Sequence, residues 1–147
     1  MVKKSIIYIF IYTLMIGCDN GLTQPEGSEY YLEASAPDLE LDENGYYHIE
    51  WIDGYVQTFS TLSAQTGSYD NYQKVGWISN KEIKILGHWT NLVNSSSYTS
   101  GGVAHTVLGV WEQFIGDTIK VYSAFQDEYG KQYTDSIGVI VEDEIQN

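Results

Sequence analysis

Short extended segments separated by turn residues run through most of this chain and set its fold class. Apolar and polar side chains alternate along residues 46–51 and 133–141, the period of a strand with one buried face. Residues 42–45 and 127–130 separate such segments and end in glycine, which readily takes the positive φ of tight turns. After Cys18 no stretch keeps a helical repeat of apolar residues. The pattern predicts an all-β protein.

Roughly seven segments carry this strand pattern, at a spacing of about 8–12 residues that is typical of an antiparallel β-sandwich or a barrel. They are residues 46–51, 55–65, 74–78, 82–86, 103–110, 117–125 and 133–141. In the second segment Phe59, Leu62 and Ala64 are expected in the core, with a bulge where their spacing breaks alternation. Residues 91–102, rich in Asn, Ser and Gly, are expected to form a long surface loop.

The amino-terminal residues have the features of a targeting signal. Lys3 and Lys4 precede an apolar run, residues 6–16, which is shorter than the roughly 20 residues of a membrane span but fits a signal peptide. Met-Ile-Gly-Cys at residues 15–18 resembles the lipobox of bacterial lipoproteins. The resemblance implies that residues 1–17 are a cleaved signal peptide and that Cys18 carries lipid, including palmitate-type acyl chains. The alternatives are an ordinary secretory signal and an uncleaved anchor.

The rest of the chain divides by composition into a tether, a folded domain and a tail. Residues 18–29 comprise the lipidated cysteine and a polar, Gly- and Pro-bearing segment without apolar periodicity, which predicts a flexible tether. Residues 30–142 form the expected β-domain, and residues 143–147 an acidic tail. Cys18 is the only cysteine, so the domain has no disulfide and depends on burial of apolar surface.

The charge of the chain excludes several partners. Seven Lys and Arg residues stand against 20 Asp and Glu, a formal net charge of −13, and no arginine is present. A nucleic-acid binder needs a basic patch to neutralise phosphates, so nucleic acid is not an expected partner. Electrostatic adhesion to an anionic membrane is disfavoured too, so the expected membrane contact is the lipid anchor, at the bacterial outer membrane or cell surface.

One internal segment resembles a known domain family. Residues 97–108, Ser-Tyr-Thr-Ser-Gly-Gly-Val-Ala-His-Thr-Val-Leu, are similar to the S-x-T-x-x-G-x-A-x-x-x-L run of bacterial Ig-like repeats of the invasin and intimin type. Residues 116–124 resemble the next strand of those repeats, and residues 127–141 would form the closing hairpin. The likeness covers about half of the chain. It implies an Ig-like antiparallel β-sandwich of the kind found on bacterial surfaces, but no particular ligand.

Signatures of catalysis are absent from the sequence. The chain lacks a Gly-x-Ser-x-Gly elbow, a Ser-x-x-Lys pair, a His-Glu-x-x-His motif and a phosphate-binding glycine loop. His48, His88 and His105 have unrelated spacing, and hydrogen-bonded strand histidines are the simpler interpretation. We therefore expect no enzyme, cofactor or metal. Calcium at the acidic segments 38–44 and 127–128 remains an alternative, because carboxylates are its preferred ligands.

Aromatic residues near the predicted loops indicate a binding surface. Trp89 and Tyr98 lie in a Tyr-, Ser-, Asn- and Gly-rich segment, a composition that suits adaptable recognition, and aromatic faces also stack on sugars. Trp51, Trp77 and Trp111 are expected in the core. The sequence thus predicts a non-enzymatic, lipid-anchored envelope protein whose Ig-like module serves adhesion or envelope assembly through a protein or glycan ligand. The alternative is a carbohydrate-binding surface lipoprotein.

Overall fold

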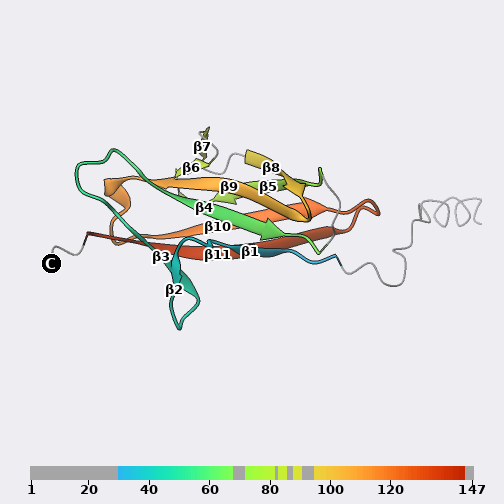
Figure 1. The fold of residues 1–147 in the computed structure, drawn as a ribbon, viewed down its shortest axis with the longest axis horizontal. Coiled ribbons are helices and arrows are strands. Elements are labelled where there is room, and N and C mark those ends of the chain that lie inside the picture. Colours follow the sequence, from blue (N-terminus) through green and yellow to red (C-terminus); the bar gives the residue numbers. More distant parts are fainter. Residues whose placement is uncertain (1–29, 68–71, 82, 86–87, 91–94, 145–147) are drawn as a thin grey trace, which may run out of the picture.

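A computed structural model describes residues 30–67, 72–81, 83–85, 88–90 and 95–144 of the chain (Figure 1). The expected signal peptide, Cys18 and the tether lie outside the described residues. Within them the chain forms eleven strands, one short 3-10 turn, η1 (Glu112–Phe114), and no α-helix, which confirms the all-β prediction. No helix in this part of the chain has the length and hydrophobicity to cross a membrane.

The strands vary widely in length. They are β1 (Glu33–Ser35), β2 (Glu40–Leu41), β3 (Tyr46–Glu50), β4 (Thr58–Gln65), β5 (Lys74–Ser79), β6 (Ile83–Ile85), β7 (His88–Thr90), β8 (Ser95–Ser100), β9 (Val103–Val110), β10 (Thr118–Gln126) and β11 (Gln132–Glu142). The expected number of roughly seven is too low for the described residues. The additional strands are mostly two or three residues long and too short to show alternation.

Nine of the strands form one continuous sheet that curls on itself, in the order β1-β4-β9-β8-β5-β10-β11-β3-β2, with β6 and β7 attached beside β9. The turning point is β8, whose Ser95–Tyr98 part pairs with β5 while Thr99 and Ser100 pair with β9. As a result β4 and β9 lie across from β10 and β11 (Figure 1). The layers share one apolar core.

The sheet is mixed, so the prediction of a purely antiparallel sheet is wrong at one pair. β3 and β11 are parallel, with Tyr47 opposite Val139 and Ile49 opposite Val141, and the other described pairs are antiparallel. A parallel pair needs a long connection between its strands, and here most of the domain supplies it. Alternation within a strand predicts which face is buried but not which strand becomes its neighbour, so the sequence pattern carried no sign of this pair.

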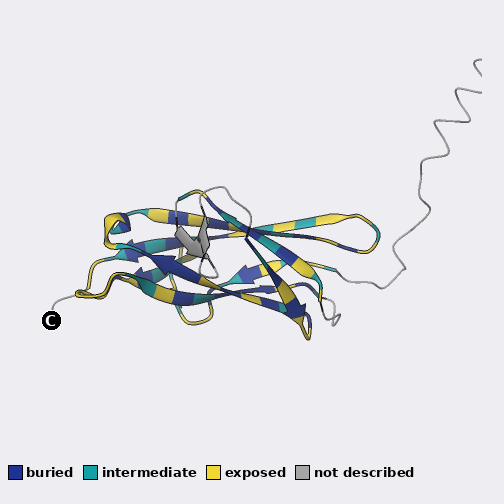
Figure 2. Cartoon of the chain, turned by 90° about the horizontal axis from the view of Figure 1, so that it is seen from above, coloured by how far each residue is buried: buried dark blue, intermediate teal, exposed yellow. Residues whose placement is uncertain are grey.

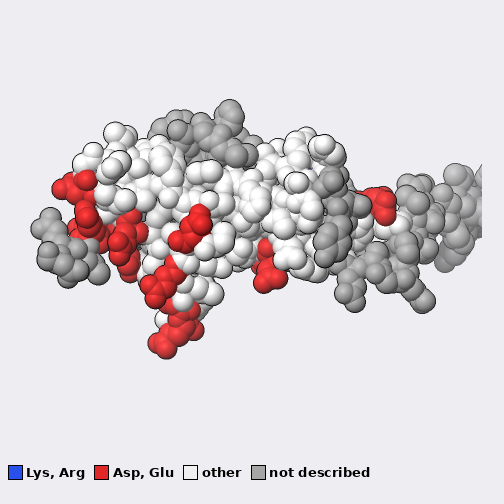
Figure 3. All heavy atoms as spheres, viewed as in Figure 1, with Lys and Arg blue, Asp and Glu red and all other residues white. Residues whose placement is uncertain are grey.

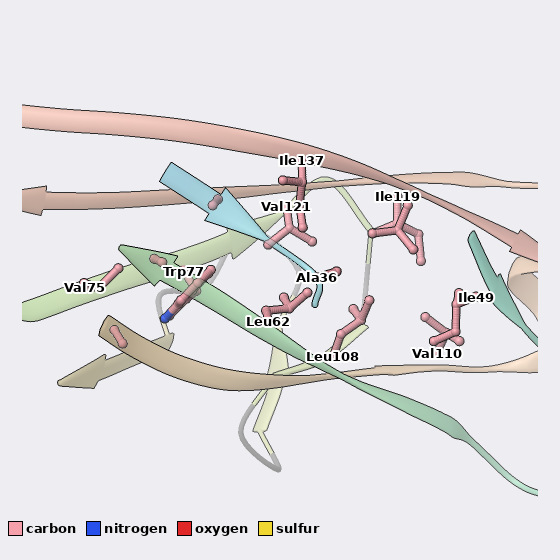
Figure 4. Close-up of a cluster of buried hydrophobic side chains, with 14 of the residues drawn as sticks. Ala36, Ile49, Leu62, Val75, Trp77, Leu108, Val110, Ile119, Val121 and Ile137 are labelled. Carbon is pink, nitrogen blue, oxygen red and sulfur yellow. The ribbon is translucent and has the colours of Figure 1, made fainter. Parts of the chain in front are cut away.

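The core consists of the alternating residues of both layers, which point toward one another (Figure 4). Burial alternates along the strands, as the colours of Figure 2 show. Trp77 is the largest fully buried side chain, at 1% exposure, and its indole N–H donates to Ser97 Oγ at 2.9 Å. The expected core positions of Trp77 and Trp51 are confirmed, and Trp111 packs, half-buried, against the edge of the core.

One expected core residue lies outside. Phe59 is 54% exposed, whereas Ser60, Leu62 and Ala64 are buried. The expected bulge is absent, because β4 pairs with β9 in unbroken register from Thr58 to Gln65. Strict alternation therefore continues through the strand, and it places a small serine rather than the phenylalanine toward the core. The bulge was predicted only because Phe59, the larger apolar side chain, was assigned to the interior.

Candidate functional site

A groove of about 620 Å³ crosses the outer face of the half-sheet formed by β8, β5, β10 and β11. Register explains its hollow floor. Ser96 lies opposite Gly76, Gly76 opposite Ala124, and Ala124 opposite Thr134, so four small side chains form one row across four strands. The rows on either side of it, on the same face of the sheet, carry larger side chains. The volume falls in the range of about 300–1,000 Å³ that is usual for small-ligand sites.

Two tyrosines stand beside the small-residue row, one on each side. Tyr122, which lines the groove and pairs in register with Ile78, is 43% exposed. Tyr98 lies opposite the groove residue Lys74 and is 59% exposed. Both rings are thus accessible on the same face of the sheet, since residues two apart on a strand share a face.

Polar side chains complete the groove. Lys74, Gln132 and Thr134 line it, and among the described residues their side chains make no hydrogen bond or ion pair with the protein. Unengaged donors and acceptors beside exposed aromatic rings are the usual elements of a ligand site. The groove can therefore bind a ligand through stacking and hydrogen bonds.

The structure places the two predicted ligand-contact residues, Tyr98 and Trp89, on different strands. Tyr98 is exposed, but it lies on a strand: the prediction of a long surface loop over residues 91–102 is wrong at β8, where Ser95, Ser97 and Thr99 are buried. Trp89 lies in β7, paired with Lys84 of β6, and its side chain lies outside the described part of the chain. Cys18 also lies outside it.

Sequence reasoning missed Tyr122 and Gly76. Alternation with buried Val121 and Ser123 was enough to place Tyr122 outside, but its position beside a groove depends on the register of β5 and β10. Gly76 has no distinguishing local pattern. An added Cβ there would meet the nearest atoms at 3.7 Å and 3.9 Å, which is ordinary contact, so a Cβ fits at this position without displacing the backbone.

A second hollow, of about 460 Å³, lies among the acidic residues of β2, β3 and the end of β11. His48 is central to it: its Nδ1 lies 2.7 Å from Glu142 Oε1 and its Nε2 lies 3.3 Å from Asp42 Oδ2. Figure 3 shows Asp and Glu side chains gathered around β2 and towards the end of the molecule where β11 finishes, with no Lys or Arg visible among the described residues of that face.

The acidic segments lack the geometry of a cation site. The described residues contain no group of three or more His, Cys, Asp or Glu side chains placed to hold a metal. Asp42 Oδ1 accepts the N–H groups of Asn44 and Tyr46, so that carboxylate stabilises the turn before β3. Asp127 does the same for the β10–β11 hairpin, accepting the N–H groups of Tyr129 and Lys131. Both acids act in their turns, and the calcium hypothesis gains no support.

The contacts of His48 make a pH-dependent contribution to stability. The hydrogen bond to Glu142, and then that to Asp42, raises the pKa of His48 above its usual 6.5, because both nitrogens donate only when the ring is protonated. This stabilisation is therefore fully present below about pH 6.5 and is lost as the pH rises through the folded-state pKa.

We expect His48→Gln to destabilise the protein more at about pH 5.5 than at about pH 8.5, as measured by urea unfolding at both pH values. His105→Gln is a matched control, since the Nδ1 of His105 contacts the hydroxyl of Ser63, at 2.9 Å, rather than a carboxylate. An equal loss at both pH values for His48→Gln would show that its ion pairs contribute nothing.

Comparison with known proteins found no family model that matches the chain and no curated protein that matches it.

Proposed function

We propose that this protein is a non-enzymatic, lipid-anchored protein of the bacterial envelope or cell surface, whose β-domain is an interaction module for adhesion or envelope assembly. Cys18 would carry the lipid, and residues 18–29 would hold the domain close to the membrane. The module would bind its partner through the outer face of β8, β5, β10 and β11.

The groove on that face is the observation that carries the proposal. It combines the accessible ring of Tyr122 with polar side chains, such as Lys74 and Gln132, that make no hydrogen bond or ion pair within the described residues. Tyrosine contributes a large contact area at low cost in conformational entropy, which is why binding surfaces favour it. A lipid anchor would hold this groove at the membrane, because two or three acyl chains give stable membrane attachment.

Two features support the finer assignment of an Ig-like β-sandwich. The curled sheet brings two layers together over a shared core, and β10 and β11 form a long hairpin closed by the turn at Asp127. Folds of this kind host many unrelated binding functions, so the fold does not select the partner. A carbohydrate-binding surface lipoprotein is the second candidate, and the tyrosine-flanked groove favours it.

The proposal can be tested by photo-crosslinking in intact cells. A photoreactive amino acid replaces Tyr122 on the groove, and separately Tyr55, which is 65% exposed in the β3–β4 loop. We expect position 122 to yield a crosslinked product, protein or carbohydrate, that position 55 does not. Equal products at both positions, or none at position 122, would contradict a binding role for this face.

A further inference from the structure

We propose that the groove on β8, β5, β10 and β11 binds a neutral polysaccharide chain, with Tyr122 stacking on a sugar ring that lies over the row of small residues. This inference rests on the proposed function, since it names the ligand class of the same face. It selects a glycan rather than a protein surface as the occupant.

The shape of the groove fits a narrow ligand that crosses the strands. The floor is set by Ser96, Gly76, Ala124 and Thr134, which the register aligns in one row. Larger residues on both sides, including Tyr122 and Lys74, make this row a trough rather than a flat face. A protein partner usually covers a broad patch, about 800 Å² on each side, whereas a trough of about 620 Å³ that larger side chains border has the shape that a narrow chain of sugar rings fills.

The chemistry of the lining matches the two kinds of surface on a sugar. A pyranose ring has an apolar face of C–H groups, which stacks on an aromatic ring such as Tyr122. Its rim carries hydroxyl groups that both donate and accept hydrogen bonds. Gln132 offers a donor and an acceptor, Thr134 a hydroxyl and Lys74 a donor, and none of these side chains is engaged elsewhere within the described residues.

Charge decides between neutral and anionic glycans. Lys74 is the one cationic side chain among the described residues that line the groove, and the chain as a whole carries a formal charge of −13. No Asp or Glu is among the described residues that line the groove, so the repulsion of a polyanion would come from the net charge of the whole chain, and its acidic groups would meet a single lysine and no arginine to pair with. A neutral polysaccharide is not repelled by the negative charge and needs no arginine partner. It is therefore the ligand class that the groove fits.

The test uses the full lipidated chain in a detergent without a sugar head group, applied to an array of neutral oligosaccharides with heparin and polygalacturonate as anionic probes. We expect binding to one or more neutral glycans and to neither polyanion. Isothermal titration with the best neutral oligosaccharide then gives the affinity. Gly76→Val should abolish binding by filling the trough, and Tyr122→Ala should weaken it about tenfold or more.

Three controls separate a lost site from a lost fold. Tyr122→Phe keeps the ring and should retain most of the affinity, and Tyr55→Ala removes an exposed tyrosine outside the groove and should leave affinity unchanged. Gly76→Val should keep the wild-type circular dichroism spectrum, because a Cβ there makes only ordinary contacts, at 3.7 Å and 3.9 Å.

A blank array, preferred binding of the polyanions, or neutral binding that is unaffected by both groove variants would overturn the glycan proposal. A protein crosslinked at position 122 together with a blank array would overturn it while leaving the interaction module intact. Absence of both would overturn the two proposals together.

Discussion

Replacing Trp77 with alanine is expected to lower the free energy of unfolding by about 3–5 kcal/mol, the usual cost of removing a large aromatic side chain from a core. Trp77 is 1% exposed and packs in the cluster that joins the two layers (Figure 4). The layers have no disulfide to hold them together, because the chain has a single cysteine. The cavity would therefore weaken the contact on which the curled sheet depends.

Urea unfolding of residues 19–147, followed by far-UV circular dichroism, measures this loss. Ser97→Ala isolates the polar part of the effect, since it leaves the buried indole N–H without its acceptor, at a cost of about 1–3 kcal/mol. Tyr55→Ala, a large exposed aromatic in a loop, should change stability by less than about 0.5 kcal/mol. An unchanged unfolding curve for Trp77→Ala would mean that the ring is not part of a packed core.

The sequence was informative wherever burial is carried by apolar side chains. Val103–Val110 is a strand with the expected bounds, and Ile137, Val139 and Val141 face the core as their alternation predicts. The hairpin turn at residues 127–130 was also predictable, because a carboxylate that accepts nearby N–H groups and a glycine at positive φ, here Gly130, are local features. The patterns that identify these elements lie within a few neighbouring residues of the sequence.

β8 was not predictable in this way, because its buried residues are polar. Ser97 accepts the hydrogen bond of Trp77, and Thr99 Oγ1 accepts the backbone N–H of Gln73 at 2.9 Å. These partners satisfy the hydroxyl groups, so a serine- and threonine-rich strand can be buried at little cost. From composition alone such a segment is predicted to be a loop. The hydrogen-bond partners that make its burial possible lie about 20 residues or more away in the sequence.

The groove could not be predicted for a related reason. Its floor combines one residue from each of four strands, and only the cross-strand register puts Gly76 beside Ala124 and Ser96. The residue types alone carry no such signal, because small residues are frequent throughout the chain. Composition did draw attention to Tyr98, which is exposed and lies two residues along β8 from the floor residue Ser96. Local composition therefore pointed to an exposed tyrosine, and only the topology shows the groove beside it.

Cys18→Ser is expected to abolish acylation of the protein completely. This substitution tests the proposed lipid anchor. The proposed thioether to diacylglycerol would need the cysteine thiol, and the chain has no second cysteine that could replace it. Loss of the proposed two or three acyl chains would also remove stable membrane attachment. A chain with a formal charge of −13 has no electrostatic attraction to an anionic bilayer that could compensate.

Metabolic labelling with an alkyne-tagged palmitate, followed by membrane fractionation, measures both consequences in cells. Wild-type protein should carry label and sediment with membranes, and Cys18→Ser should carry none. Asn20→Ala is the matched control, since it changes the segment next to the lipobox and keeps the thiol, so its label and its membrane fraction should equal those of the wild type. Mass spectrometry of the wild-type amino-terminal peptide should begin at Cys18 with acyl groups attached. Undiminished label in Cys18→Ser, or a wild-type amino terminus without acyl mass, would remove the anchor from the proposed function and leave the groove as its remaining basis.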